Sequence, residues 1–246
     1  MSTDPKGQLS VEPSRPALDP IHRALALDLD GTLLDSMQFH AGAWKQAFAE
    51  LGLDAPLEWF LLWEGINGPG VVHLTLEKLN VARSPADRQR ILDLKRAYYD
   101  QMFRPLPMPG LPLLYETLRQ LRYPVAIVTG SENRVARRVL DVIGFTDVVQ
   151  AVVGGDDIIH GKPGPDPYLK AAQALAALPQ QCIALENAPA GIQSAVAAGL
   201  TCIAVATTLP EDRLAGAHRC LPDLETFAAW LSAEFERSGG IGGWHL

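Results

Sequence analysis

Short apolar runs alternate with amphipathic stretches along much of the chain. Runs of strand length occupy residues 24–29, 125–129, 148–153, 182–185 and 201–206. Patterns of helical period lie between the later runs, at residues 111–121, 134–142, 167–177 and 191–198. Strands that alternate with helices favour right-handed crossovers. We therefore predict an α/β fold with a doubly wound, Rossmann-like parallel sheet.

One long segment breaks this alternation. Residues 37–105 contain helical patterns and no strand-like run, and the turn-rich RPLPMPG leads the chain out of them. We expect an all-helical domain here, inserted after the first strand into a core domain of residues 24–36 and 106–246. Residues 1–23 are rich in Pro, Ser and charge, which predicts a flexible arm. The pattern also predicts a closing helix within 221–236 and a flexible tail at 238–246.

Composition excludes several classes of protein. A net charge of −7 without a basic cluster disfavours nucleic acid as a partner. No apolar run approaches the roughly 18 residues of a membrane span, and the first residues lack the apolar centre of a signal peptide. The three cysteines have no metal-ligand spacing and their odd number suits a reducing compartment. We expect a cytoplasmic protein without a membrane or nucleic-acid partner, as a monomer or weak dimer.

The string LALDLDGTLLDS, residues 25–36, carries the most informative chemistry. An apolar strand leads into Asp28 and Asp30, whose spacing sends both side chains to the same side, and Gly31 permits a tight turn. Two carboxylates at a strand tip can hold a hard cation while one attacks an electrophile and the other moves a proton. Asp-x-Asp-Gly also occurs at ordinary turns, but this pair favours phosphoryl chemistry.

Other polar residues stand near the later strands. Thr129, Gly130 and Ser131 offer hydroxyl and backbone N–H groups that can bind a phosphate oxygen. Lys162, which precedes prolines in HGKPGPDPYL, can neutralise phosphoryl charge. An apolar strand runs into Glu186 and Asn187. Because ligands of parallel sheets bind beyond the carboxyl ends of the strands, these groups are expected to face one site.

Taken in order, DLDGTLLDS, VTGSEN, GKPGPDP and ENAPAG resemble the motifs of the haloacid dehalogenase-like superfamily. The helical insert resembles the cap of its β-phosphoglucomutase-like subfamily. The resemblance implies that Asp28 is the nucleophile that becomes an aspartyl phosphate, and that Asp30 is the general acid and base. It also implies a catalytic charge at Lys162, phosphate binding by Thr129, Gly130, Ser131 and Asn133, and Mg²⁺ held by Asp28, Asp30, Glu186 and Asn187.

The fourth motif departs from the family pattern. Many relatives carry two acids where this chain has Glu186 and Asn187. An amide oxygen can ligate Mg²⁺ but brings no charge, so Glu186 and Asp28 would supply most of the attraction. We expect weaker Mg²⁺ binding than at an all-carboxylate site. Whether Glu186 or Asn187 is the direct ligand stays open.

The insert bears on the substrate. DSMQFHAGAWKQAF resembles the cap entry of the subfamily, which implies that His40 couples cap closure to the general acid; a histidine packed on a helix face is the alternative. Mutases of the subfamily hold a second phosphate with a cap arginine, where EGINGPG offers Gly68. The sequence therefore predicts a Mg²⁺-dependent phosphatase for a small phosphorylated metabolite, such as a sugar phosphate. A phosphosugar mutase and a catalytically idle ligand-binding protein are the alternatives.

Overall fold

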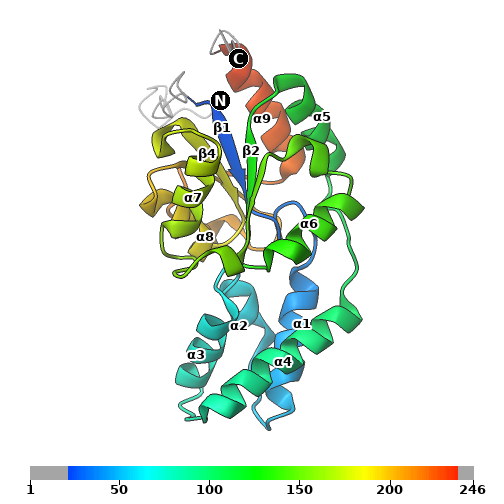
Figure 1. Cartoon of the computed structure of the whole chain (residues 1–246), viewed down its shortest axis with the longest axis vertical. Helices are drawn as coiled ribbons and strands as arrows, with labels where there is room; N and C mark the ends of the chain where they lie inside the picture. Colours follow the sequence, from blue (N-terminus) through cyan, green and yellow to red (C-terminus); the bar gives the residue numbers. More distant parts are fainter. Residues whose placement is uncertain (1–21, 238–246) are drawn as a thin grey trace, which may run out of the picture.

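A parallel sheet of six strands forms the centre of the larger part of the protein (Figure 1). The computed structural model describes residues 22–237. Its strands lie in the order β3-β2-β1-β4-β5-β6, and every neighbouring pair is parallel. The strands are β1 (Ala24–Leu27), β2 (Val125–Val128), β3 (Ala151–Val153), β4 (Cys182–Glu186), β5 (Thr201–Val205) and β6 (Arg219–Leu221). Strand order reverses beside β1, so the doubly wound α/β fold is confirmed.

Helices cover both faces of this sheet because β1 is apolar on both sides. Leu25 and Leu27 pack with one set of helices, whereas Ala24 and Ala26 pack with the other. The small alanines let the second set approach the sheet closely. The first set is α5 (Leu111–Leu121), α6 (Asn133–Val142) and α9 (Leu224–Arg237). The second set is α7 (Asp166–Ala174) and α8 (Pro189–Ala197).

Element boundaries differ from the sequence predictions at several places. β1 ends at Leu27, so Asp28 and Asp30 lie in the loop after the strand. β3 begins only at Ala151, because Thr146–Val148 form a single 3₁₀ turn. α7 ends at Ala174, and Ala176 takes a left-handed φ of 51°. The edge strand β6 was not predicted, since it has only three residues and a proline follows.

Four helices form the insert, which lies beyond the carboxyl ends of the strands (Figure 1). They are α1 (Met37–Ala49), α2 (Leu57–Leu62), α3 (Gly68–Lys78) and α4 (Pro85–Met102). The insert has its own apolar core, in which the ring of Phe60 stacks on those of Trp44 and Phe48. The side chains of Asn67 and Ser84 cap α3 and α4. An isolated bridge between Leu34 and Pro107 joins the two connections to the sheet.

Some predictions concern the ends of the chain. The arm predicted at residues 1–23 lies almost entirely outside the described residues, as does the predicted tail at 238–246. The proposed domain limits, 24–36 with 106–246 and 37–105, stay predictions. Within the described part of the chain, no helix has the length and apolar character needed to cross a bilayer.

Candidate active site

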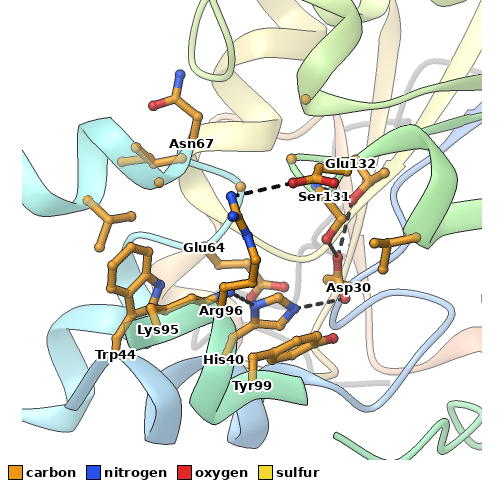
Figure 2. A pocket seen from close by; sticks show the side chains of 18 of the residues that line it. Asp30, His40, Trp44, Glu64, Asn67, Lys95, Arg96, Tyr99, Ser131 and Glu132 are labelled. Atoms are coloured by element: carbon orange, nitrogen blue, oxygen red, sulfur yellow. Dashed lines mark hydrogen bonds and ion pairs between the residues drawn. The ribbon is translucent and has the colours of Figure 1, made fainter. Parts of the chain in front are cut away.

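A cavity of about 500 Å³ separates the carboxyl edge of the sheet from the helical insert. Its wall includes Asp28, Asp30, Thr129, Gly130 and Ser131 from the core. His40, Trp44, Glu64, Gly68, Lys95 and Arg96 come from the insert. Figure 2 shows the side chains of the two parts facing one another across this space. The parallel topology thus brings the first two predicted motifs together with the insert.

Lys162 lies between two buried carboxylates. Its Nζ donates to Oδ1 of Asp28 and to Oε1 of Glu186, both at 2.6 Å, and to the carbonyl of Val128 at 3.1 Å. Burial alone would lower the pKa of Lys162, but the charges of Asp28 and Glu186 raise it above its ordinary value. The lysine is therefore held as a cation beside Asp28, which lines the cavity.

Asp28 keeps one oxygen free. Its side chain is buried, and Oδ2 has no hydrogen-bond partner among the described residues. Burial raises the pKa of Asp28 to about 7, although Lys162 acts in the opposite direction. Lys162 fixes Oδ1, which leaves Oδ2 as the oxygen that can attack an electrophile or bind a metal.

Asp30 is bonded to both parts of the protein. Its Oδ1 accepts from Ser36 Oγ at 2.7 Å and from His40 Nε2 at 3.1 Å. Its Oδ2 accepts from Thr129 Oγ1 at 3.2 Å and from Ser131 Oγ at 3.0 Å. Burial would raise the pKa of Asp30, but His40 and the hydroxyl donors hold it well below the ordinary value. In this arrangement Asp30 is a carboxylate, the form that accepts a proton.

His40 is held on its other side by Lys95, which the sequence did not single out. Lys95 Nζ lies 3.0 Å from His40 Nδ1, and the ring of Tyr99 lies 4.2 Å from the imidazole (Figure 2). Burial lowers the pKa of Lys95 to about 8. Burial and then the charge of Lys95 lower the pKa of His40, against the effect of Asp30. His40 of the insert thus contacts Asp30, and its predicted coupling of cap closure to the general acid stays a prediction.

Asn187 is fully buried and bonded to the insert. Its Nδ2 donates to Glu64 Oε1 and to Thr208 Oγ1, both at 2.8 Å, and its Oδ1 accepts from Thr32 Oγ1 at 3.0 Å. Gly31 has a φ of 76°, and a Cβ there would collide with Asn187 Nδ2 and Glu64 Oε1. Glycine at position 31 therefore lets the insert and the core meet.

Glu64 is the second residue that sequence reasoning missed. It is 5% exposed, and its Oε2 has no hydrogen-bond partner among the described residues. Burial, followed by the charge of Asp28, raises the pKa of Glu64 well above its ordinary value. The segment EGINGPG was considered only for Gly68, and nothing in its periodicity shows that Glu64 reaches the core.

Asn133 does not join the predicted phosphate group. Its Nδ2 donates to the carbonyl of Val152 at 3.0 Å and to Asp157 Oδ2 at 2.6 Å, and its N–H donates to Asp156 Oδ1 at 2.6 Å. These contacts anchor the loop after β3. Thr129, Gly130 and Ser131 do line the cavity, and their binding of phosphate stays a prediction.

The insert places cationic side chains in the wall of the cavity, although Gly68 itself brings no charge. A Cβ at Gly68 would come within 2.9 Å of Leu92 Cδ2, so a larger residue there would require the Leu92 side chain to shift. Arg96, however, extends from α4 across the cavity and lies 3.6 Å from Glu132 of the core (Figure 2). The inference that the insert lacks a cation for a second phosphate is therefore weakened, because Arg96 and Lys95 both line the cavity.

Comparisons with known proteins agree with this architecture. A family model described as a haloacid dehalogenase-like hydrolase matches residues 22–199. Hexitol phosphatase A of Escherichia coli is 32% identical, over 82% of this chain and 92% of that protein. Fructose-1-phosphate phosphatase YqaB of Escherichia coli is 29% identical, over 75% of this chain and 96% of that protein. The crystal structure of β-phosphoglucomutase from Clostridium difficile has a TM-score of 0.77 at 23% identity, covering 88% of this chain and 98% of that one.

Proposed function

The chain belongs to the haloacid dehalogenase-like hydrolase family, and from this premise we propose that it is a Mg²⁺-dependent phosphatase acting through an aspartyl phosphate on Asp28. The carrying observation is the geometry of Asp28, whose Oδ1 is held by Lys162 at 2.6 Å while the buried Oδ2 has no partner among the described residues. Two of the similar proteins are named as phosphatases of phosphorylated sugars or hexitols, which supports a phosphomonoester as substrate.

The two aspartates divide the reaction between them. Asp28 Oδ2 forms a bond to phosphorus while the bond from phosphorus to the leaving oxygen breaks. Asp30 takes up a proton from solvent before this step and gives it to that oxygen. The resulting carboxylate then takes a proton from the water that attacks the aspartyl phosphate, which releases phosphate and restores Asp28. Lys162 neutralises charge at both stages.

The residues at this edge fit a magnesium ion. Bound Mg²⁺ supplies positive charge to the phosphoryl oxygens. The carboxylate of Asp28 and the main-chain carbonyl of Asp30 would hold it. Glu186 is a poor third ligand, because Lys162 and Tyr168 bond to its Oε1 and the N–H of Asn187 bonds to its Oε2. Among the described residues, no three His, Cys, Asp or Glu side chains form a ready metal site.

The cavity favours a small polar substrate. Its volume of about 500 Å³ suits a small metabolite rather than a polymer. Trp44 forms part of the apolar wall, and Lys95 and Arg96 offer charge for a phosphate or hydroxyl groups. A sugar phosphate is therefore the proposed substrate class. A cytoplasmic location remains part of the proposal.

The test is phosphate release from a panel of sugar phosphates, phosphoglycolate and nucleotides, with and without Mg²⁺. We expect turnover that needs both Mg²⁺ and Asp28, and its loss in Asp28→Asn. Phosphate release that persists in Asp28→Asn would overturn the assignment of the nucleophile. Absence of turnover on the panel and on an aryl phosphate would favour the idle ligand-binding protein.

A phosphosugar mutase is the second candidate, and the position of Arg96 favours keeping it. A mutase must retain a bisphosphorylated intermediate, and Arg96 lines the cavity beside the insert. The two activities separate in one assay with β-glucose 1-phosphate. A mutase forms glucose 6-phosphate with little free phosphate, whereas the proposed phosphatase releases phosphate and glucose.

A further inference from the structure

Glu64 brings a carboxylate from the insert into the core of the site. It follows α2, and its Oε1 accepts from Asn187 Nδ2 at 2.8 Å. Its side chain is nearly inaccessible, and Oε2 is without a hydrogen-bond partner in the described part of the chain. A buried carboxylate oxygen without a partner is costly, so this position calls for a ligand that the protein itself does not supply.

The charges around Glu64 indicate what that ligand is. Three buried carboxylates, on Asp28, Glu186 and Glu64, form one group, since the charges of the first two act on Glu64, and Lys162 is bonded only to those two. When all are ionised, three negative charges and one positive charge leave two negative charges. The two carboxylate oxygens without partners, Asp28 Oδ2 and Glu64 Oε2, belong to this group. A divalent cation matches both the excess charge and the free oxygens.

We propose that Glu64 is an acidic ligand of the metal site. Asn187 has no carboxylate to offer, so the insert supplies the one that the core lacks. This inference rests on the proposed Mg²⁺-dependent activity and extends it. Asn187 acts as a positioning residue: its amide N–H fixes Oε1 of Glu64 and leaves Oε2 for the metal. An aspartate at position 187 would instead repel Glu64, which explains why an amide and a carboxylate occur here as a pair.

The role proposed for Glu64 has a structural consequence. Glu64 belongs to the segment that joins α2 to α3, and its neighbour Gly65 also meets the core, since a Cβ there would lie 3.2 Å from Lys162 Cδ. A metal bound between Asp28 and Glu64 holds this segment against the sheet edge. Metal binding and the closed arrangement of insert and core are thus coupled.

The test is Mg²⁺ binding by isothermal titration calorimetry without substrate, on the full chain. Glu64→Gln keeps the size of the side chain and removes its charge, and we expect Mg²⁺ affinity to fall roughly tenfold or more. The double variant Glu64→Gln with Asn187→Asp returns the carboxylate to the core, and affinity should recover to within a few fold of the starting protein. Glu58→Gln, an exposed change on α2, is the matched control and should bind Mg²⁺ normally.

Two results overturn the inference. One is a Mg²⁺ affinity of Glu64→Gln equal to that of the unaltered protein. The other is a loss in Glu64→Gln that the double variant does not recover, which would assign the effect to contact between insert and core. Thermal melting of each variant establishes that it is folded. If the unaltered protein itself binds no Mg²⁺, the proposed metal-dependent activity fails, and that outcome is distinct from both.

Discussion

Lys95 Nζ lies 3.0 Å from His40 Nδ1, and this contact sets the tautomer of the imidazole. An ammonium group only donates hydrogen bonds, so Nδ1 accepts and the ring proton of neutral His40 resides on Nε2. That nitrogen lies 3.1 Å from Asp30 Oδ1 and donates to it. A lysine of the insert therefore determines how the proposed general acid is held.

Removal of this lysine should slow the reaction. In Lys95→Met the imidazole is free to turn or to change tautomer, so the donor to Asp30 is lost for part of the time. We expect kcat to fall about tenfold or more, with a smaller change in KM. Lys78→Met is the matched control, because Lys78 also lies over aromatic rings of the insert, 4.4 Å from that of Trp59. Equal losses in the two variants would contradict a positioning role.

The same lysine should give the rate an alkaline limit. Burial lowers the pKa of Lys95 to about 8, so the folded protein loses this charge as the pH rises through 8. The charged donor to His40 weakens in that range. We expect kcat to decline above pH 8, and we expect Lys95→Met to lack this step. A pH–rate profile of both proteins provides the measurement, and an unchanged alkaline limb in Lys95→Met would refute the assignment.

Tyr168 should stabilise the folded protein through Glu186. Its hydroxyl donates to Glu186 Oε1 at 2.6 Å, and both side chains are buried. Tyr168→Phe leaves the carboxylate with one donor fewer, which should cost about 1–3 kcal/mol in the free energy of unfolding. Tyr115→Phe removes an exposed hydroxyl bond to Asp147 and should cost much less. Urea unfolding of the two variants gives the comparison; similar midpoints would contradict the prediction.

The sequence predicted those parts of the site that the sheet determines. Asp28, Thr129 and Glu186 come together because strands that run parallel end at one edge, and the apolar runs together with the family motifs locate them in the sequence. Glu64 and Lys95 escaped prediction because their positions depend on how the insert meets the core. No local pattern encodes that contact.

The directions in which side chains point could not be predicted from the sequence either. Asn133 follows Ser131 closely, yet its amide turns to Val152 and Asp157 while the Ser131 hydroxyl bonds to Asp30. The start of α6 at Asn133 separates the two directions. Strand β6 was missed for a different reason, since three residues are too few for a periodic pattern.

Arg96 should contribute to substrate binding. It extends over the cavity and lies 3.6 Å from Glu132, and because both side chains are largely exposed this pair adds little to stability. In Arg96→Gln we expect KM for the best sugar phosphate to rise several fold while kcat changes little. Arg90→Gln, an exposed change on the same helix, serves as the control. An unaltered KM in Arg96→Gln would remove the arginine from the substrate site.

Asn187→Asp tests the metal site from the side of the core. The new carboxylate adds a negative charge beside Asp28, so Mg²⁺ should bind more tightly than in the unaltered protein. Without metal, the new side chain lacks the N–H that donates to Glu64 Oε1 at 2.8 Å, and its charge repels Glu64. The free energy of unfolding should therefore fall by about 1–3 kcal/mol. Melting temperatures with and without Mg²⁺ measure both effects. A variant whose Mg²⁺ dependence is unchanged or weaker would show that Asn187 does not belong to the metal site.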